Sequence, residues 1–158
     1  MDDLERCYVS GLRILKYRFN STAELRRKLR AKGFDAETIN ATVMRLANEK
    51  WLDDERFAAA YVRTRALKSK GRLRIRRELM SAGVDDETIA RVVGENIDAD
   101  DERQRAAATA LKRLPILVNR YGAQAARNKL TAYLLKQGYD AALVREIVNE
   151  TRGLSPRP

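Results

Sequence analysis

Histidine is absent from the 158 residues, and cysteine occurs once, at Cys7. Without histidine the chain has no imidazole general base, no Ser-His or Cys-His nucleophile pair and none of the usual histidine ligands for zinc. A single cysteine excludes an intrachain disulfide and a thiolate metal cluster, which suits a reducing, cytoplasmic setting. We therefore expect a protein that is not an enzyme and that holds no metal or cofactor.

Long apolar runs and phosphate-binding motifs are also missing. No apolar run reaches the roughly 18 residues of a membrane span, and the first residues lack the apolar stretch of a signal peptide. Neither a G-x-x-x-x-G-K-[ST] loop nor a G-x-G-x-x-G fingerprint occurs. The carboxylate pairs Asp53-Asp54 and Asp100-Asp101 do not converge on one substrate, because neighbours in a helix point about 100° apart. We interpret both pairs as helix caps rather than as catalytic or Mg²⁺ sites.

Positive charge is abundant, and strand signals are few. The chain has 32 Lys and Arg against 22 Asp and Glu, a formal net charge of +10. Such an excess implies an anionic partner, either nucleic acid or an acidic protein surface. Three prolines, eight glycines and little β-branched alternation favour an all-α fold.

The stretch from Trp51 to Val93 predicts three short helices around a small core. Carboxylates at Asp53 and the next two positions predict a helix start, since they complement the free N–H groups there. A second helix follows Gly71 and ends at Gly83, where a left-handed backbone would close it. Asp85 then caps a third helix.

Three copies of this pattern occupy the chain. The apolar, glycine and aspartate markers of the central copy are Ile75, Leu79, Gly83, Asp85, Ile89 and Val93. The same markers stand 50 residues earlier, at Leu25, Leu29, Gly33, Asp35, Ile39 and Val43. They return 55 residues later, at Leu130, Leu134, Gly138, Asp140, Val144 and Val148. Because Asp100-Asp101-Glu102-Arg103 repeats Asp53-Asp54-Glu55-Arg56 at an offset of only 47, the third copy holds eight extra residues.

These offsets predict three tandem three-helix repeats over residues 1–50, 51–97 and 98–152, followed by a disordered tail over 153–158. Pro115 and Gly122 fall in the insertion near 115–122 and suit a longer loop or a broken helix end. Units that contact mainly their neighbours would make an elongated, curved body, a shape that suits a protein lying along a polymer.

Eight basic residues and no acidic one lie between Arg63 and Arg77, which we call the basic segment: Arg63, Arg65, Lys68, Lys70, Arg72, Arg74, Arg76 and Arg77. Positive charge at the start of a helix, as at Arg72 and Arg74, is unfavourable by roughly 0.3–1 kcal/mol. We therefore expect a partner outside the helix to bind these side chains. A solvated basic face is the alternative.

The stretches Glu24-Leu25-Arg26-Arg27-Lys28-Leu29-Arg30-Ala31-Lys32-Gly33-Phe34 and Leu52-Asp53-Asp54-Glu55-Arg56-Phe57-Ala58 resemble the RecX family of recombination regulators, as does Arg74-Ile75-Arg76-Arg77-Glu78-Leu79. The similarity runs from about residue 12 to residue 148 and is weaker in the third repeat. There, Thr131 and Ala132 replace the paired arginines.

The resemblance implies tandem three-helix repeats and a negative regulator of RecA that binds in the groove of the RecA–DNA filament. It implies suppression of filament growth, ATP hydrolysis and strand exchange. The expected contact residues are the basic segment, with Arg26, Arg27 and Arg30 as the corresponding patch of the first repeat. We also expect weak, largely non-specific binding of single- or double-stranded DNA, no membrane contact and a monomer. The alternative is a stand-alone DNA-binding helical module.

Overall fold

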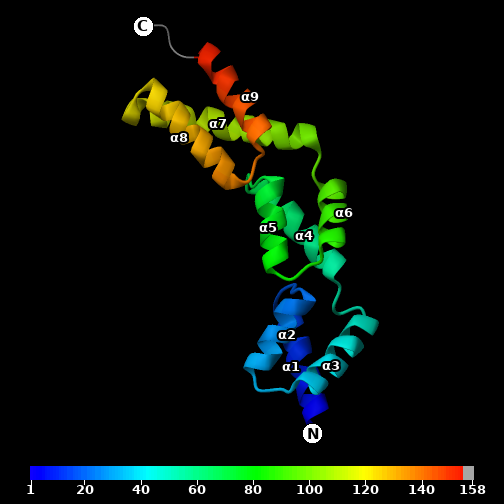
Figure 1. Ribbon diagram of the computed structural model, residues 1–158. Coiled ribbons are helices and arrows are strands. Elements are labelled where there is room, and N and C mark those ends of the chain that lie inside the picture. The colour runs from blue at the N-terminus through cyan, green and yellow to red at the C-terminus, as the bar shows by residue number, and fades with distance from the viewer. Residues whose placement is uncertain (155–158) are drawn as a thin grey trace. The chain divides into compact units, whose positions relative to one another are not determined.

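The computed structural model describes residues 1–154, which form nine α-helices, one 3-10 helix and no strand (Figure 1). The helices are α1 (Asp3–Tyr17), α2 (Thr22–Ala31), α3 (Ala36–Asn48), α4 (Asp54–Leu67), α5 (Arg72–Ser81), α6 (Asp86–Asn96), α7 (Ala99–Tyr121), α8 (Ala123–Gln137) and α9 (Ala141–Thr151), with η1 (Arg152–Leu154) as the 3-10 helix. The prediction of an all-α chain of three-helix repeats is confirmed. The exact boundaries between repeats stay a prediction.

The chain divides into two compact units, and each is described by itself. Unit 1 comprises residues 1–61 and 78–92, and unit 2 comprises residues 62–77 together with the described residues from 93 onward. The three boundaries between the units cut α4, α5 and α6 once each, so these central helices contribute to both units. The basic segment lies entirely in unit 2.

The core of unit 1 is formed where α1, α2 and α3 pack on one another. Its buried members are Cys7, Leu25, Leu29, Ile39, Val43, Leu46 and Leu52. Local signals set the ends of these helices, because Ser21 and Asp35 cap α2 and α3 by accepting backbone N–H groups three residues ahead. Burial raises the pKa of the Cys7 thiol, since the charged thiolate is disfavoured away from water.

The core of unit 2 is formed by α7, α8 and α9. Its buried members are Ala106, Ala110, Leu130, Leu134, Tyr139, Val144, Ile147 and Val148. Asp98 is the N-cap of α7 and Asp140 is the N-cap of α9. The N-cap of α7 therefore lies two residues before Asp100 and three before Asp101, so the prediction that this pair caps α7 is wrong.

The eight extra residues of the third repeat lengthen α7 instead of forming a loop. Pro115 lies inside the helix, so the expectation of a longer loop at this residue is wrong. Leu114 and Leu117 pack against the core of unit 2 on either side of Pro115, and this burial offsets the lost backbone hydrogen bond. The helix ends at Gly122, with φ of 84°.

Predicted caps and glycine ends in the central repeat are confirmed. Arg56 N–H donates to the Asp53 carboxylate at 3.1 Å, and Thr88 N–H donates to Asp85 at 2.9 Å. Gly83 has φ of 82°, in the left-handed region expected at the end of α5.

The predicted disordered tail begins at Gly153, but Gly153 and Leu154 belong to η1. The rest of that prediction, residues 155–158, lies outside the described residues. Within residues 1–154, no helix combines the length and apolarity that a membrane crossing requires.

Candidate functional site

The basic segment covers the end of α4, the connection 68–71 and the first turns of α5. Four of its side chains are exposed and four are half-buried. The exposed ones are Arg63, Lys68, Arg76 and Arg77; the half-buried ones are Arg65, Lys70, Arg72 and Arg74. The eight basic residues, which the sequence does not distinguish, therefore differ in solvent exposure.

Arg72 has its partner inside the chain. Its guanidinium Nε lies 3.2 Å from the carboxylate of Glu102 in α7, and its backbone N–H donates to the same carboxylate at 3.1 Å. The Glu102 side chain is only 6% exposed. The buried Glu102 balances both the Arg72 guanidinium and the N-terminal dipole of α5, so the positive charge at this helix start has an internal partner. Contact between Arg72 and an outside partner stays a prediction.

Lys70 and the connection around it are bound to the end of α8. The Lys70 ammonium donates to the side-chain oxygen of Gln137 at 2.7 Å, and the Gly71 N–H donates to the Gln137 carbonyl at 2.8 Å. The buried Tyr139 hydroxyl donates to the Ser69 carbonyl at 2.9 Å. These contacts make the connection a fixed part of unit 2.

Arg74 lies where α5 and the end of α8 meet most closely. A Cβ atom added at Gly138 would stand 2.3 Å from the Arg74 Cβ, and one added at Gly71 would stand 2.3 Å from the Gly138 carbonyl carbon. Leu73 N–H also donates to the Gly138 carbonyl at 3.0 Å. The two backbones are in contact here because Gly71 and Gly138 have no side chains. The Cβ atom of Arg74 lies at this contact.

The first-repeat patch lies on α2 in unit 1. Arg27 and Arg30 are exposed, whereas Arg26 is half-buried and donates to the side-chain oxygen of Asn40. Arg27 and Arg30 lie three residues apart and therefore share one face of α2.

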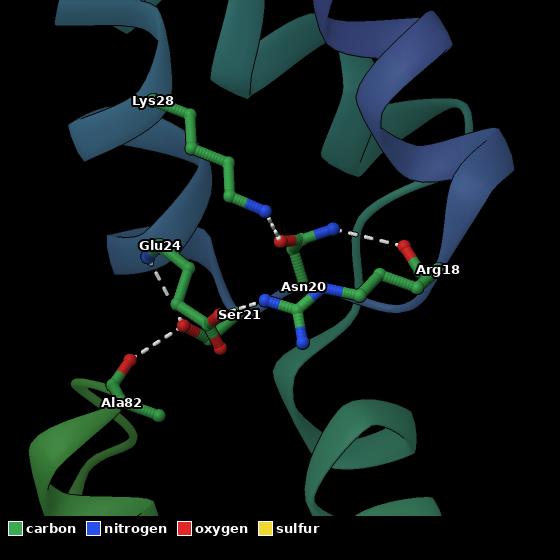
Figure 2. A network of polar contacts seen from close by, with 6 residues as sticks. All are labelled: Arg18, Asn20, Ser21, Glu24, Lys28 and Ala82. Atoms are coloured by element: carbon green, nitrogen blue, oxygen red, sulfur yellow. Dashed lines mark hydrogen bonds and ion pairs between the residues drawn. The ribbon is translucent and has the colours of Figure 1, made fainter. Parts of the chain in front are cut away.

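The start of α2 carries a polar network that joins it to the end of α5 (Figure 2). The Ser21 hydroxyl accepts the Glu24 N–H at 3.1 Å and donates to the Ala82 carbonyl. The Glu24 carboxylate pairs with Arg18 at 3.2 Å. Burial, assisted by the nearby positive charge of Arg18, lowers the pKa of Lys28, which donates to Asn20 at 2.6 Å.

Sequence reasoning missed that carboxylates of one repeat cap a helix of another. Asp54 accepts the Thr22 N–H of α2 at 2.7 Å, as Glu102 accepts the Arg72 N–H of α5. Both carboxylates belong to the repeated Asp-Asp-Glu-Arg motif, which was assigned only to capping its own helix. Each motif supplies three acids, of which Asp54 is the second and Glu102 the third, so the acids beyond the first were the available signal.

Two family models match the chain. The model for RecX, second three-helix domain, matches residues 53–93, and the model for RecX, first three-helix domain, matches residues 7–46. Two similar proteins are each named "Regulatory protein RecX". The one from Clostridium perfringens (strain 13 / Type A) is 33% identical over 153 residues, covering 94% of this chain and 71% of the relative. The one from Xanthomonas campestris pv. campestris (strain B100) is 35% identical over 140 residues, covering 85% and 81%.

Solved structures agree with these relatives. The crystal structure of RecX from Lactobacillus salivarius superposes with a TM-score of 0.81 and 25% identity, covering 96% of this chain and 97% of the other. Sequence and fold match the same family over nearly the whole chain. The chain therefore belongs to the RecX family of regulatory proteins.

Proposed function

We propose that this chain is a negative regulator of RecA that binds in the groove of the RecA–DNA filament. It inhibits filament growth, ATP hydrolysis and strand exchange by occupying that groove as a cytoplasmic monomer, and it makes or breaks no covalent bond. Family membership supports the regulatory role. The filament offers phosphates and protein carboxylates, and arginine side chains bind both in bidentate geometry.

The anchored basic segment carries this proposal. The internal bonds of Lys70 and Arg72 fix the chain, and the exposed Arg63, Lys68, Arg76 and Arg77 then project from a rigid support. A rigid support lowers the entropic cost of binding, because the side chains alone must be ordered. Arg27 and Arg30 of the first-repeat patch would make corresponding contacts, with Arg26 held by Asn40.

The test measures the DNA-dependent ATPase of a cognate RecA during titration with the purified chain. We expect inhibition at substoichiometric amounts, and we expect Arg76→Glu with Arg77→Glu to abolish it while the circular dichroism stays unchanged. Both side chains are exposed, so their substitution costs within about 0.5 kcal/mol of stability. Arg13→Glu with Lys16→Glu, an equal charge change at exposed positions of α1, is the matched control.

An ATPase unaffected across the full titration would contradict the proposal. Equal loss of inhibition in the control would mean that net charge matters rather than the basic segment. The competing function is a stand-alone DNA-binding module, for which the net charge of +10 is the supporting observation. Its binding should collapse between about 50 and 200 mM salt, whereas a regulator that also contacts protein should stay on the filament.

A further inference from the structure

The hairpin of α7 and α8 carries no carboxylate from Arg103 to Tyr139, a span of 37 residues with eight Lys and Arg. This acid-free run is longer than the basic segment, although its charges are farther apart. It includes nearly all of two helices that pack along each other (Figure 1). Their spacing decides which cations share a face.

Four of these cations fall on two facing stripes. Arg113 and Arg120 lie seven residues apart on α7, and Lys129 and Lys136 lie seven apart on α8, so each pair shares one side of its helix. Seven residues correspond to about 10 Å along a helix axis.

Two tyrosines join the stripes. The Arg113 guanidinium lies 3.7 Å from the centre of the Tyr133 ring, across from α7 to α8. The Lys129 ammonium lies 4.3 Å from the centre of the Tyr121 ring, and the Arg120 guanidinium lies 5.3 Å from it. We call this surface the hairpin face: Arg113, Arg120, Tyr121, Lys129, Tyr133 and Lys136.

The charges of the hairpin face are not neutralised within unit 2. All four cations are exposed, and none of them forms an ion pair with another of residues 1–154. The acids of α7 itself lie in its first turn, and Glu146 and Glu150 of the neighbouring α9 both bind Arg103, near that same end of α7. Arg120 lies 17 residues beyond Arg103, about 25 Å along the helix.

The exposed ring of Tyr121 beside the cations of the hairpin face favours single-stranded nucleic acid over other polyanions. Tyr121 is 42% exposed even though two cations contact it. Cations alone would bind any polyanion, but an aromatic ring adds a platform on which an unpaired base can stack. A duplex offers no free base face, because its bases are already stacked.

We propose that the hairpin face binds single-stranded nucleic acid, with phosphates on Arg113, Arg120, Lys129 and Lys136 and a base stacked on Tyr121. The basic segment takes no part in this surface, so the proposal stands whether or not the chain acts on RecA. It adds a strand-binding site to the third repeat, in which the paired arginines of the earlier repeats are missing.

The test measures fluorescence anisotropy of a labelled oligothymidine of about 20 nucleotides, titrated with the full chain at several salt concentrations. We expect Arg120→Gln with Lys129→Gln to raise the Kd about 10-fold. It should also flatten the dependence of log Kd on log salt by about 1.4, since each phosphate contact contributes about 0.7 for single strands. Arg13→Gln with Lys16→Gln removes the same charge from α1 and should change the Kd less than about 3-fold, with the slope unchanged.

Tyr121→Ala separates stacking from charge. It should raise the Kd about 10-fold with an unchanged salt slope, because no phosphate contact is lost. Equal effects of the hairpin and α1 pairs, or an unaffected Kd in Tyr121→Ala, would overturn the proposal. Competition by polyglutamate as effective as by the unlabelled oligonucleotide would also overturn it and indicate an acidic protein partner. If the first pair lost helicity, Arg113→Gln with Lys136→Gln would replace it.

Discussion

The carboxylate of Glu102 accepts two hydrogen bonds from Arg72, one from the backbone N–H at 3.1 Å and one from the guanidinium Nε at 3.2 Å. Through this pair the start of α7 caps the start of α5. The charge of Arg72 is therefore balanced within unit 2.

We expect Glu102→Ala to lower the free energy of unfolding by about 3 kcal/mol, because it removes a buried acceptor and leaves Arg72 without its partner. Glu102→Gln keeps an acceptor oxygen and should cost about half as much. Urea denaturation followed by circular dichroism measures both. Glu95→Ala, at an exposed position of α6, is the control and should stay within about 0.5 kcal/mol. Equal stability of Glu102→Ala and Glu95→Ala would show that the pair does not stabilise the chain.

Gly33 and Gly138 end equivalent helices with similar backbone angles, φ of 94° and 101°, but different surroundings. A Cβ at Gly33 would meet nothing within 4 Å, whereas a Cβ at Gly138 would stand 2.3 Å from the Arg74 Cβ. We expect Gly33→Ala to cost about 1 kcal/mol from backbone strain alone and Gly138→Ala more than about 3 kcal/mol. Melting curves of the two variants should therefore differ clearly, and equal melting temperatures would contradict the close contact.

Pro115 interrupts the hydrogen bonding of α7 at an exposed position. We expect Pro115→Ala to raise the free energy of unfolding by about 1–3 kcal/mol, since alanine restores the bond to the Leu111 carbonyl and has the highest helix propensity. Thermal unfolding of the full chain measures the change. A loss of stability would instead mean that Pro115 itself is needed for the packing of Leu114 and Leu117.

Tyr139 is 1% exposed, and burial, together with the negative charge of Glu102, raises its pKa to about 12 from the ordinary 10. A raised pKa means that the folded state favours the neutral phenol. Its contribution to stability is complete below pH 10 and is lost as the pH rises from 10 to 12. We expect absorbance titration at 295 nm to show a late phase near pH 12 that Tyr139→Phe removes. Tyr8, whose pKa is raised mainly by its hydrogen bond to Glu49, stays in the variant as an internal reference.

The helix ends were predictable because they depend on neighbours in the sequence. Ser21, Asp35 and Asp85 cap helices by accepting the backbone N–H group three residues ahead. Gly83 closes α5 because its left-handed backbone favours glycine. The same local rules failed at Pro115, where helix propensity predicts a break and burial of Leu114 and Leu117 keeps the helix continuous.

The sequence predicts which residues make up the basic segment, but it does not predict which of their side chains have partners inside the chain. The acid-free run from Arg63 to Arg77 is visible in the sequence, yet nothing nearby indicates that Glu102 binds Arg72 or that Gln137 binds Lys70. These partners are 30 and 67 residues away. Such pairs form only when the end of α8 and the start of α7 meet the start of α5.

The sequence by itself determined the helices, their repeating caps and the excess of positive charge, because each depends on residue type and on spacing within a few turns. Only the tertiary structure decided which charges stay available. A buried carboxylate lowers its free energy by pairing with the nearest cation, whatever their separation along the chain. Glu102 thus retains Arg72, while Arg76 and Arg77 remain exposed one turn farther along the same helix.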